Sequence, residues 1–383
     1  MNYILAIYLA SLIKDILHST AVIDSLADFT CYYNAIVSIL KGLNPYTIDS
    51  MFGYIYPPTS FLFIGLFGTV DYIVAKYLWI LLSLVAFFVS QWILVTSLFK
   101  ENRVFYFLIF TILGVNLFPF KHTLGMGQIN LFILLISTLI YYSYINNKKT
   151  LAGLFLAVAT AIKISPIILV IFFIRKREYK TIASFIISFV TLTVTAAIMF
   201  GWNISQYYWT TSFPGIQQGS DEYANQSLSA FMNRLMISNL HVSLVNSCLF
   251  LAATILTYIL INKQKTSQNI SLLEFSLPIE LGLIFSGITW NHHLVIMLLP
   301  IMSLYRYCMH SNSSIKTRFF TGIATTIAYY LISILLDEPT KYAGITVIAR
   351  SHALMGVILC TTLAAYILLK QSLRTVELRH RIV

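Results

Sequence analysis

Long apolar runs recur from one end of this chain to the other, separated by short polar segments. A helix needs about 17–25 mostly apolar residues to cross a bilayer, and the runs at 72–99, 151–174 and 344–369 are each long enough. Of the 383 residues, 58% are hydrophobic and only 10% are charged, whereas a soluble domain carries about a quarter of charged residues. We therefore expect an all-α polytopic membrane protein with roughly 11–13 membrane helices.

The net charge of +11 would suggest a nucleic-acid partner in a soluble protein. Here the basic residues gather in short clusters between apolar runs, for example at 175–180, 306–318 and 370–381. The positive-inside rule places such clusters in the cytoplasm, so we predict no nucleic-acid partner. The four cysteines are scattered without a CxxC pair, which predicts neither a metal site nor a disulfide framework.

The order of apolar and polar segments predicts one integral membrane domain, residues 1–383, with its polar loops on one outer side. Its expected parts are a first membrane helix at 1–20, an outer loop at 21–58, helices at 59–201, a second outer loop at 202–241, and C-terminal helices with a basic cytoplasmic tail at 242–383. A short outer loop is expected at 120–127. Lys14 and Asp15 lie within the first helix, where charged side chains usually face the protein interior.

The first outer loop holds three of the fourteen acidic residues, Asp24, Asp28 and Asp49. Asp28 is a good helix N-cap and Gly42 a good residue to follow a helix end, so a helix is predicted over 29–41. Apolar and aromatic residues recur along it at helical spacing, which predicts an amphipathic helix lying on the membrane interface.

A lysine interrupts the apolar run at 151–174. Lys163 stands three residues before Pro166, which predicts a hairpin of two short helices, and a lysine at membrane depth indicates a pocket for an anionic partner. The alternatives are a snorkelling lysine or one that pairs with a carboxylate such as Glu280. The run at 59–68, after Pro57-Pro58, is too short to span simply and fits a re-entrant segment.

Several polar side chains could together supply a general base and cations that bind a phosphate. Asp28 could act as a general base, the alternative being that it only caps its helix. Arg234 could bind phosphate bidentately, the alternative being a solvated loop charge. His292 and His293 offer donors at an outer turn, and no HExxH pattern supports a metal there. A lipid-phosphate sugar donor would need such cations for its leaving phosphate, and its acceptor would need one base.

Short motifs occur in a characteristic order over about residues 1–305. They are Asp28-Phe29-x-x-Tyr32-Tyr33-x-Ala35, Gly42-x-Asn44-Pro45-Tyr46, Tyr54-x-Tyr56-Pro57-Pro58, Gly127-Gln128-x-Asn130, Ala152-Gly153 through Lys163-x-x-Pro166, Asn225-Gln226-Ser227-Leu228 and His292-His293 before Pro300. In these motifs the chain resembles the family-87 glycosyltransferases of the GT-C superfamily, the polyprenol-phosphate-mannose-dependent α-mannosyltransferases and their relatives.

The resemblance implies a GT-C fold with Asp28 as the base that activates the acceptor hydroxyl. It places Lys163 and the histidine pair near the donor phosphate and sugar. The remaining motif residues would frame the acceptor or the loops: Tyr32, Tyr33, Asn44, Tyr46, Tyr56, Gln128 and Asn225. No cofactor and no metal site are predicted, because the first loop lacks an Asp-x-Asp.

The implied reaction is an inverting transfer of a sugar, most simply mannose, from a polyprenyl phosphate to a lipid-linked or cell-envelope glycan, with an α-linkage. The enzyme would lie in the plasma membrane with its site on the extracytoplasmic face. Arabinofuranose is the alternative sugar. A transporter or flippase of lipid-linked sugar would predict internal repeats, which are not visible. A polysaccharide ligase or polymerase would carry its large outer loop late in the chain.

Overall fold

The computed structural model describes residues 1–22, 26–47, 53–217, 220–235, 239–311, 313–336 and 345–380. The described residues form helices and contain one isolated β-bridge, between Asn225 and Trp290, but no strand. The predicted all-α class is confirmed. Two acidic residues of the first outer loop, Asp24 and Asp49, lie outside the described residues. Chain contacts divide the protein into two compact units.

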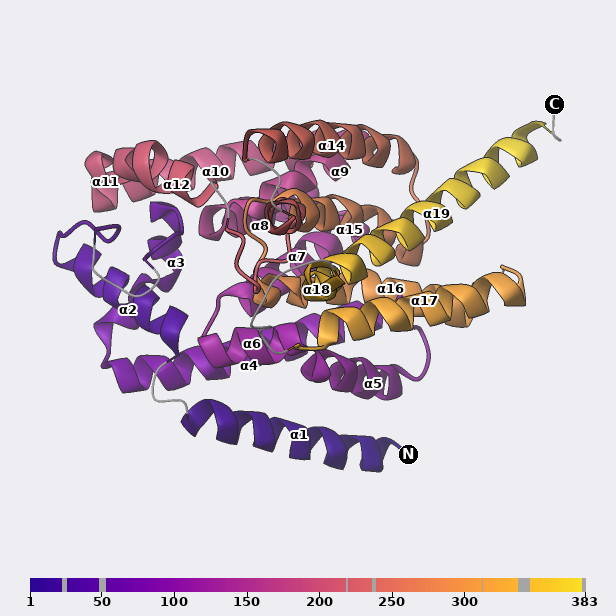
Figure 1. Cartoon of the computed structure of the whole chain (residues 1–383), viewed down its shortest axis with the longest axis horizontal. Coiled ribbons are helices and arrows are strands. Elements are labelled where there is room, and N and C mark those ends of the chain that lie inside the picture. Colours follow the sequence, from indigo (N-terminus) through magenta and orange to yellow (C-terminus); the bar gives the residue numbers. More distant parts are fainter. Residues whose placement is uncertain are drawn as a thin grey trace. The chain divides into compact units, whose positions relative to one another are not determined.

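The first unit comprises Met1–Asn116, Phe120–Ile167 and Lys180–Gln218. Its helices and short helical turns are α1 (Asn2–Val22), α2 (Ala27–Leu40), η1 (Pro58–Ser60), α3 (Phe61–Ile64), η2 (Gly65–Thr69), α4 (Tyr72–Leu98), α5 (Arg103–Asn116), most of α6 (Phe118–Met126), α7 (Asn130–Ile145), α8 (Lys149–Ile162), α10 (Tyr179–Phe200), α11 (Trp202–Tyr207), η4 (Tyr208–Ser212) and α12 (Phe213–Gln217). Within it α4 packs along α7, α7 along α8, and α1 along α5 (Figure 1).

The second unit comprises Leu117–Pro119, Ile168–Tyr179 and Gly219–Val383. Its elements are the end of η3 (Ser165–Leu169), α9 (Val170–Arg175), α13 (Leu228–Arg234), α14 (Asn239–Leu260), α15 (Gln268–Phe285), η5 (Asn291–Met297), α16 (Leu298–His310), α17 (Ile315–Ser333), α18 (Ile345–Arg350) and α19 (His352–His380). The helices α17 and α19 pack closely because Gly356 has no side chain: a Cβ there would lie 2.9 Å from the carbonyl oxygen of Ala328.

Four described helices are long and apolar enough to cross a membrane: Tyr72–Leu98, Tyr179–Phe200, His241–Leu260 and His352–Leu373. A fifth span is possible if α5 and α6, which meet at 67°, count together. In α10 only 11% of the apolar window is buried, so most of this helix offers its side chains to lipid. The chain is therefore an integral membrane protein. The expected 11–13 membrane helices also count apolar helices of 10–17 residues, and that number stays a prediction.

Two segments that were predicted as loops contain helices. Residues 120–126 belong to α6, whose first turn accepts Pro119 because proline fits the start of a helix. The second predicted loop, 202–241, holds α11, η4, α12, α13 and the start of α14. Ser227 caps α13 by accepting a hydrogen bond from the Ala230 amide at 3.2 Å, a local signal for a helix start.

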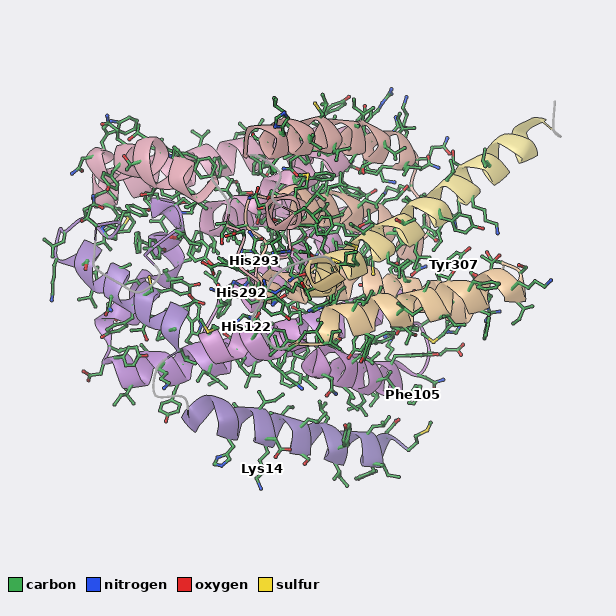
Figure 2. All side chains as sticks on the ribbon, viewed as in Figure 1. Lys14, Phe105, His122, His292, His293 and Tyr307 are labelled. Atoms are coloured by element: carbon green, nitrogen blue, oxygen red, sulfur yellow. The ribbon has the colours of Figure 1, made fainter. Side chains whose placement is uncertain are left out.

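The charged pair in α1 is exposed rather than turned to the protein interior. Both Lys14 and Asp15 are exposed, and Figure 2 shows Lys14 pointing away from the neighbouring helices of its unit. The prediction that they face inward is therefore wrong.

Candidate active site

Asp28 lies inside the first turn of α2 and does not cap it. The N-cap is Leu26, with φ −72° and ψ 93°, so the interpretation of Asp28 as a capping residue is wrong. At the other end Gly42 follows the helix as predicted, with φ +72°. The Gly42 amide bonds the Ile39 carbonyl at 3.0 Å and the Leu43 amide bonds the Ser38 carbonyl at 2.9 Å, a Schellman ending.

The apolar side of α2 packs on η2, and its Phe29 also contacts aromatic rings of α4. Phe29 is fully buried, with its ring centroid 5.0 Å from that of Trp79 and 6.1 Å from that of Phe67. Contacts within the protein thus account for the apolar stripe, and the location of the helix at the membrane interface stays a prediction. Burying an aromatic ring of this size contributes about 2–3 kcal/mol. The buried ring of Phe29 therefore fixes the first turn of α2, which carries Asp28.

The turn after α6 brings a glutamine onto Asp28. Gly127 has φ +70°, and a Cβ there would lie 2.6 Å from Phe29 Cβ and 2.9 Å from Leu26 Cβ, so only glycine allows this approach. The next residue, Gln128, donates from Nε2 to Asp28 Oδ2 at 2.5 Å. The Gly127-Gln128 motif therefore acts as a close contact followed by a hydrogen-bond partner for the acid.

Two tyrosines complete this group. The hydroxyls of Tyr32 and Tyr56 donate to Gln128 Oε1 at 2.8 and 3.1 Å. Tyr46 supports Tyr56 by donating from its hydroxyl to the Tyr56 carbonyl at 2.8 Å, and Asn44 Oδ1 accepts the Tyr46 amide at 3.0 Å. Four of the predicted frame residues thus hold each other in one network around the Asp28 partner.

Tyr33 is not part of that network. Its hydroxyl donates to the Val70 carbonyl at 2.9 Å, an exposed contact that ties α2 to the segment before α4. The structure therefore gives Tyr33 a place beside the helix but not beside the carboxylate.

Lys163 follows the end of α8 in the same unit. The helix stops at Ile162 and Lys163 is extended, with φ −147° and ψ 126°, which confirms the predicted break. Its Nζ donates to Asn130 Oδ1 at 3.0 Å, in the first turn of α7. The alternative partner Glu280 accepts instead from Thr361, with Oγ1 and Oε2 2.7 Å apart. Sequence reasoning assigned Asn130 no role, although it belongs to the same motif as Gln128.

The electrostatics of the Asp28 group favour a base that titrates near neutrality. Burial raises the pKa of Asp28 to about 6, while the hydrogen bond from Gln128 and the charge of Lys163 oppose the rise. A half-buried carboxylate with such a pKa is ionised at neutral pH yet binds a proton readily. This combination suits proton abstraction from a hydroxyl.

In the second unit, Asn225 organises the loop before α13. Its side chain is fully buried and its Nδ2 donates to the carbonyls of Ser220 and Gly287, at 2.7 and 3.0 Å. Its Oδ1 accepts the amides of Thr289 and Ser227, at 2.8 and 3.2 Å. Asn225 matches the N-glycosylation pattern, but a buried amide nitrogen that donates twice is not open to sugar attachment.

Arg234 braces the same loop. It is 8% exposed, and its Nη1 donates to the carbonyls of Asn225 and Glu222 at 2.9 and 3.1 Å. Its Nη2 donates to Ser351 Oγ at 2.8 Å. The alternative of a solvated loop charge is therefore wrong, and the predicted contact with phosphate stays a prediction.

The histidine pair follows a residue that is hydrogen-bonded to this loop. The Asn291 amide donates to the Ala224 carbonyl at 3.0 Å, directly before His292 in η5. His292 is 5% exposed, and its ring lies against that of His293 with centroids 4.7 Å apart and planes at 74° (Figure 2). Four predicted residues of the second unit thus share one local arrangement, as the Asp28 group does in the first.

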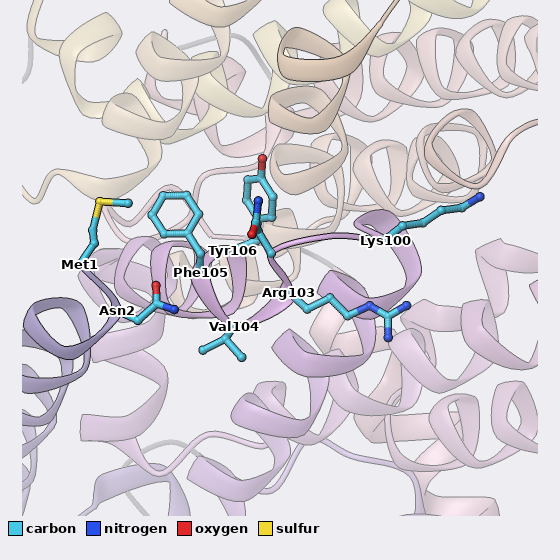
Figure 3. A pocket seen from close by; sticks show the side chains of 8 residues that line it. Met1, Asn2, Lys100, Arg103, Val104, Phe105 and Tyr106 are labelled. Atoms are coloured by element: carbon cyan, nitrogen blue, oxygen red, sulfur yellow. The ribbon is translucent and has the colours of Figure 1, made fainter.

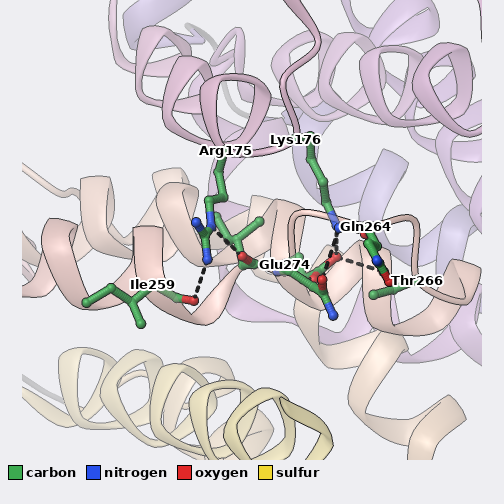
Figure 4. Close-up of polar contacts among 8 residues, drawn as sticks. Arg175, Lys176, Ile259, Gln264, Thr266 and Glu274 are labelled. Atoms are coloured by element: carbon green, nitrogen blue, oxygen red, sulfur yellow. Dashed lines mark hydrogen bonds and ion pairs between the residues drawn. The ribbon is translucent and has the colours of Figure 1, made fainter. Parts of the chain in front are cut away.

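Two further features lie at basic clusters. A cavity of about 620 Å³ lies beside the α4–α5 turn, where Lys100 and Arg103 line it (Figure 3). Since α4 has 27 residues, this turn is about 40 Å along the helix from the end that packs on α2. In the second unit Lys176 forms a buried ion pair with Glu274 at 2.6 Å (Figure 4). The sequence predicted only a basic cluster at 175–180 and gave no partner for this lysine.

Among the described residues, no group of three or more histidine, cysteine, aspartate or glutamate side chains could hold a metal ion. The chemistry that the Asp28 group offers is a proton acceptor, an amide donor and a lysine cation within one unit.

Comparison with known proteins identifies the family of the chain. The model of glycosyltransferase family 87 matches residues 54–287, which include Gln128, Lys163 and Asn225. A Mycobacterium tuberculosis (strain ATCC 25618 / H37Rv) protein, the polyprenol-phosphate-mannose-dependent alpha-(1-2)-phosphatidylinositol mannoside mannosyltransferase, is 26% identical over 187 residues. The match covers 47% of this chain and 42% of that relative. Because the family model spans more than half of its length, the chain belongs to glycosyltransferase family 87.

Proposed function

We propose that this enzyme transfers a sugar, in the first instance mannose, from a polyprenyl phosphate to a hydroxyl of a lipid-linked or envelope glycan. The observation that carries the proposal is the Asp28 carboxylate, half-buried, bonded by Gln128 and within the field of Lys163. A membrane enzyme with one such base can activate an acceptor hydroxyl without a second carboxylate. The mannosyltransferase relative supports the choice of donor.

In the proposed reaction Asp28 accepts the proton of the acceptor hydroxyl. The acceptor oxygen forms a bond to the anomeric carbon while the bond from that carbon to the phosphate oxygen breaks. The bonding electrons leave with the polyprenyl phosphate, and the proton stays on Asp28 until solvent removes it. Attack from the side opposite the phosphate inverts a β-linked donor to an α-linked product.

The second part of the proposal is that cations stabilise the leaving phosphate. A polyprenyl phosphate is a stable anion as it leaves, so it needs positive charge and no general acid. Lys163 is the proposed cation of the first unit, since its Nζ is held by Asn130 and its charge already acts on Asp28. Arg234, His292 and His293 are proposed as further contacts to the donor, and no protein-bound metal is assigned.

We place the site on the extracytoplasmic face of the plasma membrane, because the basic clusters between the apolar runs belong in the cytoplasm. The products of the reaction will identify the acceptor and the linkage position. The test uses the purified protein in lipid nanodiscs with radiolabelled polyprenyl-phosphate mannose and extracted membrane glycolipids. Labelled glycolipid is the expected product, and mass spectrometry then identifies the linkage.

The Asp28→Asn variant is the matched control. We expect a 10²–10⁴-fold loss of transfer, the usual contribution of general base catalysis, with normal membrane insertion. Full turnover in this variant would overturn the assignment of Asp28 as the base. Transfer from a polyprenyl-phosphate arabinofuranose donor but not from the mannose donor would retain the mechanism and replace the sugar.

A further inference from the structure

We infer that Gln128 is the positioning residue of the base: Tyr32 and Tyr56 fix its amide in one orientation, so that its NH₂ group holds one oxygen of Asp28 and leaves the other to the acceptor. This inference rests on the proposed role of Asp28. The atoms that carry it come from three separate stretches of the first unit: α2, the segment before η1 and the turn at Gly127.

The orientation follows from which atoms can donate. A side-chain amide has one accepting end and one donating end, whereas an ionised carboxylate only accepts. Two phenol hydroxyls point at Gln128 Oε1, at 2.8 Å from Tyr32 and 3.1 Å from Tyr56. With Oε1 held by both, Nε2 must face Asp28, and it lies 2.5 Å from Oδ2. The reversed amide would place its oxygen against the carboxylate.

Both phenols keep their protons under working conditions. Burial raises the pKa of Tyr32 and of Tyr56 above the ordinary value for a phenol, so both remain donors. Tyr32 is 4% exposed, Tyr56 3% and Gln128 5%, so water competes little for these bonds. The amide is therefore held by buried neutral donors on one side and presents its NH₂ group to the acid on the other.

Such an amide supports the charged form of Asp28. Its NH₂ group bonds the charged carboxylate more strongly than the neutral acid, because a hydrogen bond to a charged acceptor is the stronger one. The other ionisable groups on the elements around the α2 start are Cys31, Tyr33, Tyr72, Lys76 and Tyr77, with Lys121 and His122 on α6, and beyond them Lys163. Of the charged groups among these, Lys163 is the one whose field lowers the pKa of Asp28.

The test measures the protonation of Asp28 directly and in parallel with activity. Infrared spectra of each protein, minus those of its Asp28→Asn counterpart, report the carboxyl titration without any sugar substrate. In Gln128→Leu we expect the midpoint to rise by about one to two pH units, the size expected for a lost hydrogen bond to a charge. Gln128→Glu should raise it too, because two adjacent carboxyls share a proton.

The pH dependence of kcat/KM should change in the same way as the infrared titration of Asp28. The acid limb of kcat/KM should move to higher pH by the same amount, with donor KM unchanged, and Tyr32→Phe should show a smaller shift in the same direction. Gln91→Leu, which removes another fully buried glutamine of the first unit, should leave both midpoints where they are.

An Asp28 midpoint that stays unchanged in both Gln128 variants would overturn the inference. Gln128→Glu preserves the side-chain shape, so an unchanged midpoint in this variant alone would overturn the contact between the two side chains, even where Gln128→Leu does not fold. The infrared arm needs no donor or acceptor. A wild-type protein without transferase activity would therefore defeat the proposed function while the titration still decides the role of Gln128.

Discussion

Gly127 meets Phe29 so closely that a Cβ on residue 127 would lie 2.6 Å from the Cβ of Phe29. The two residues are far apart in sequence, and their contact places the turn after α6 on the first turn of α2. Gln128 reaches Asp28 as a consequence. The geometry of the Asp28–Gln128 pair is therefore set by a glycine one residue before Gln128.

Replacing Gly127 by alanine should separate Gln128 from Asp28. The φ of +70° costs about 1–3 kcal/mol for a residue with a Cβ, and the overlap with Phe29 and Leu26 adds to this. We expect a lower melting temperature and at least a tenfold loss of kcat. Gly42→Ala is the control, because Gly42 has φ +72° but nothing within 4 Å of its Cβ position. Equal losses in the two variants would argue against the contact.

The pH dependence of transfer should report Asp28. Its pKa is raised to about 6, so kcat/KM should fall about tenfold for each pH unit below 6 and be level above it. A carboxyl whose pKa is raised on folding opposes folding once it is ionised, above its unfolded pKa. Asp28→Asn should therefore melt no lower than wild type at neutral pH. A rate that does not decline well below pH 6 would contradict the assignment.

Lys163→Met should weaken donor binding. The loss of one charged contact to phosphate corresponds to roughly a tenfold or larger increase in donor KM, with a smaller change in kcat. Because the lysine charge lowers the pKa of Asp28, the acid limb of kcat/KM should also move to higher pH. Lys180→Met, an exposed lysine of the same unit, should change neither. An unaltered donor KM in Lys163→Met would count against the phosphate contact.

Asn225→Ala should destabilise the second unit. The change removes four hydrogen bonds and leaves the buried amides of Ser227 and Thr289 without their acceptor, at about 1–3 kcal/mol for each such group. Thermal melting in detergent should show a clear decrease. Asn146→Ala, at an exposed asparagine, should melt like wild type, and comparable decreases in both would show that the loop network contributes little.

Local signals predicted several features correctly. Gly42 ends α2 because a glycine readily adopts positive φ, and the break at Lys163 follows from a proline and a charge inside an apolar run. Helix α4 starts and ends within one residue of the apolar run at 72–99. Each of these depends on residues close together in sequence, so the chain itself carries the information.

Other features depend on residues far apart in sequence. Nothing local distinguishes α6 from a loop, and nothing near Lys14 indicates that this face of α1 is exposed. The partner of Asp28 stands 100 positions away and the partner of Lys163 stands 33 away. The partners of Arg234 also come from afar, since Ser351 and the loop carbonyls accept its hydrogen bonds.

The sequence by itself determined an all-α membrane protein and its family, because apolar runs and short motifs can be recognised from residues close together in the chain. Tertiary structure alone decided that Asp28 lies within its helix and not at its cap, and that it faces an amide held by two phenols. Those properties come from burial and from close approach between distant segments. Burial also raises the pKa of Asp28, and the burial of a side chain depends on the folded structure rather than on its neighbours in the sequence.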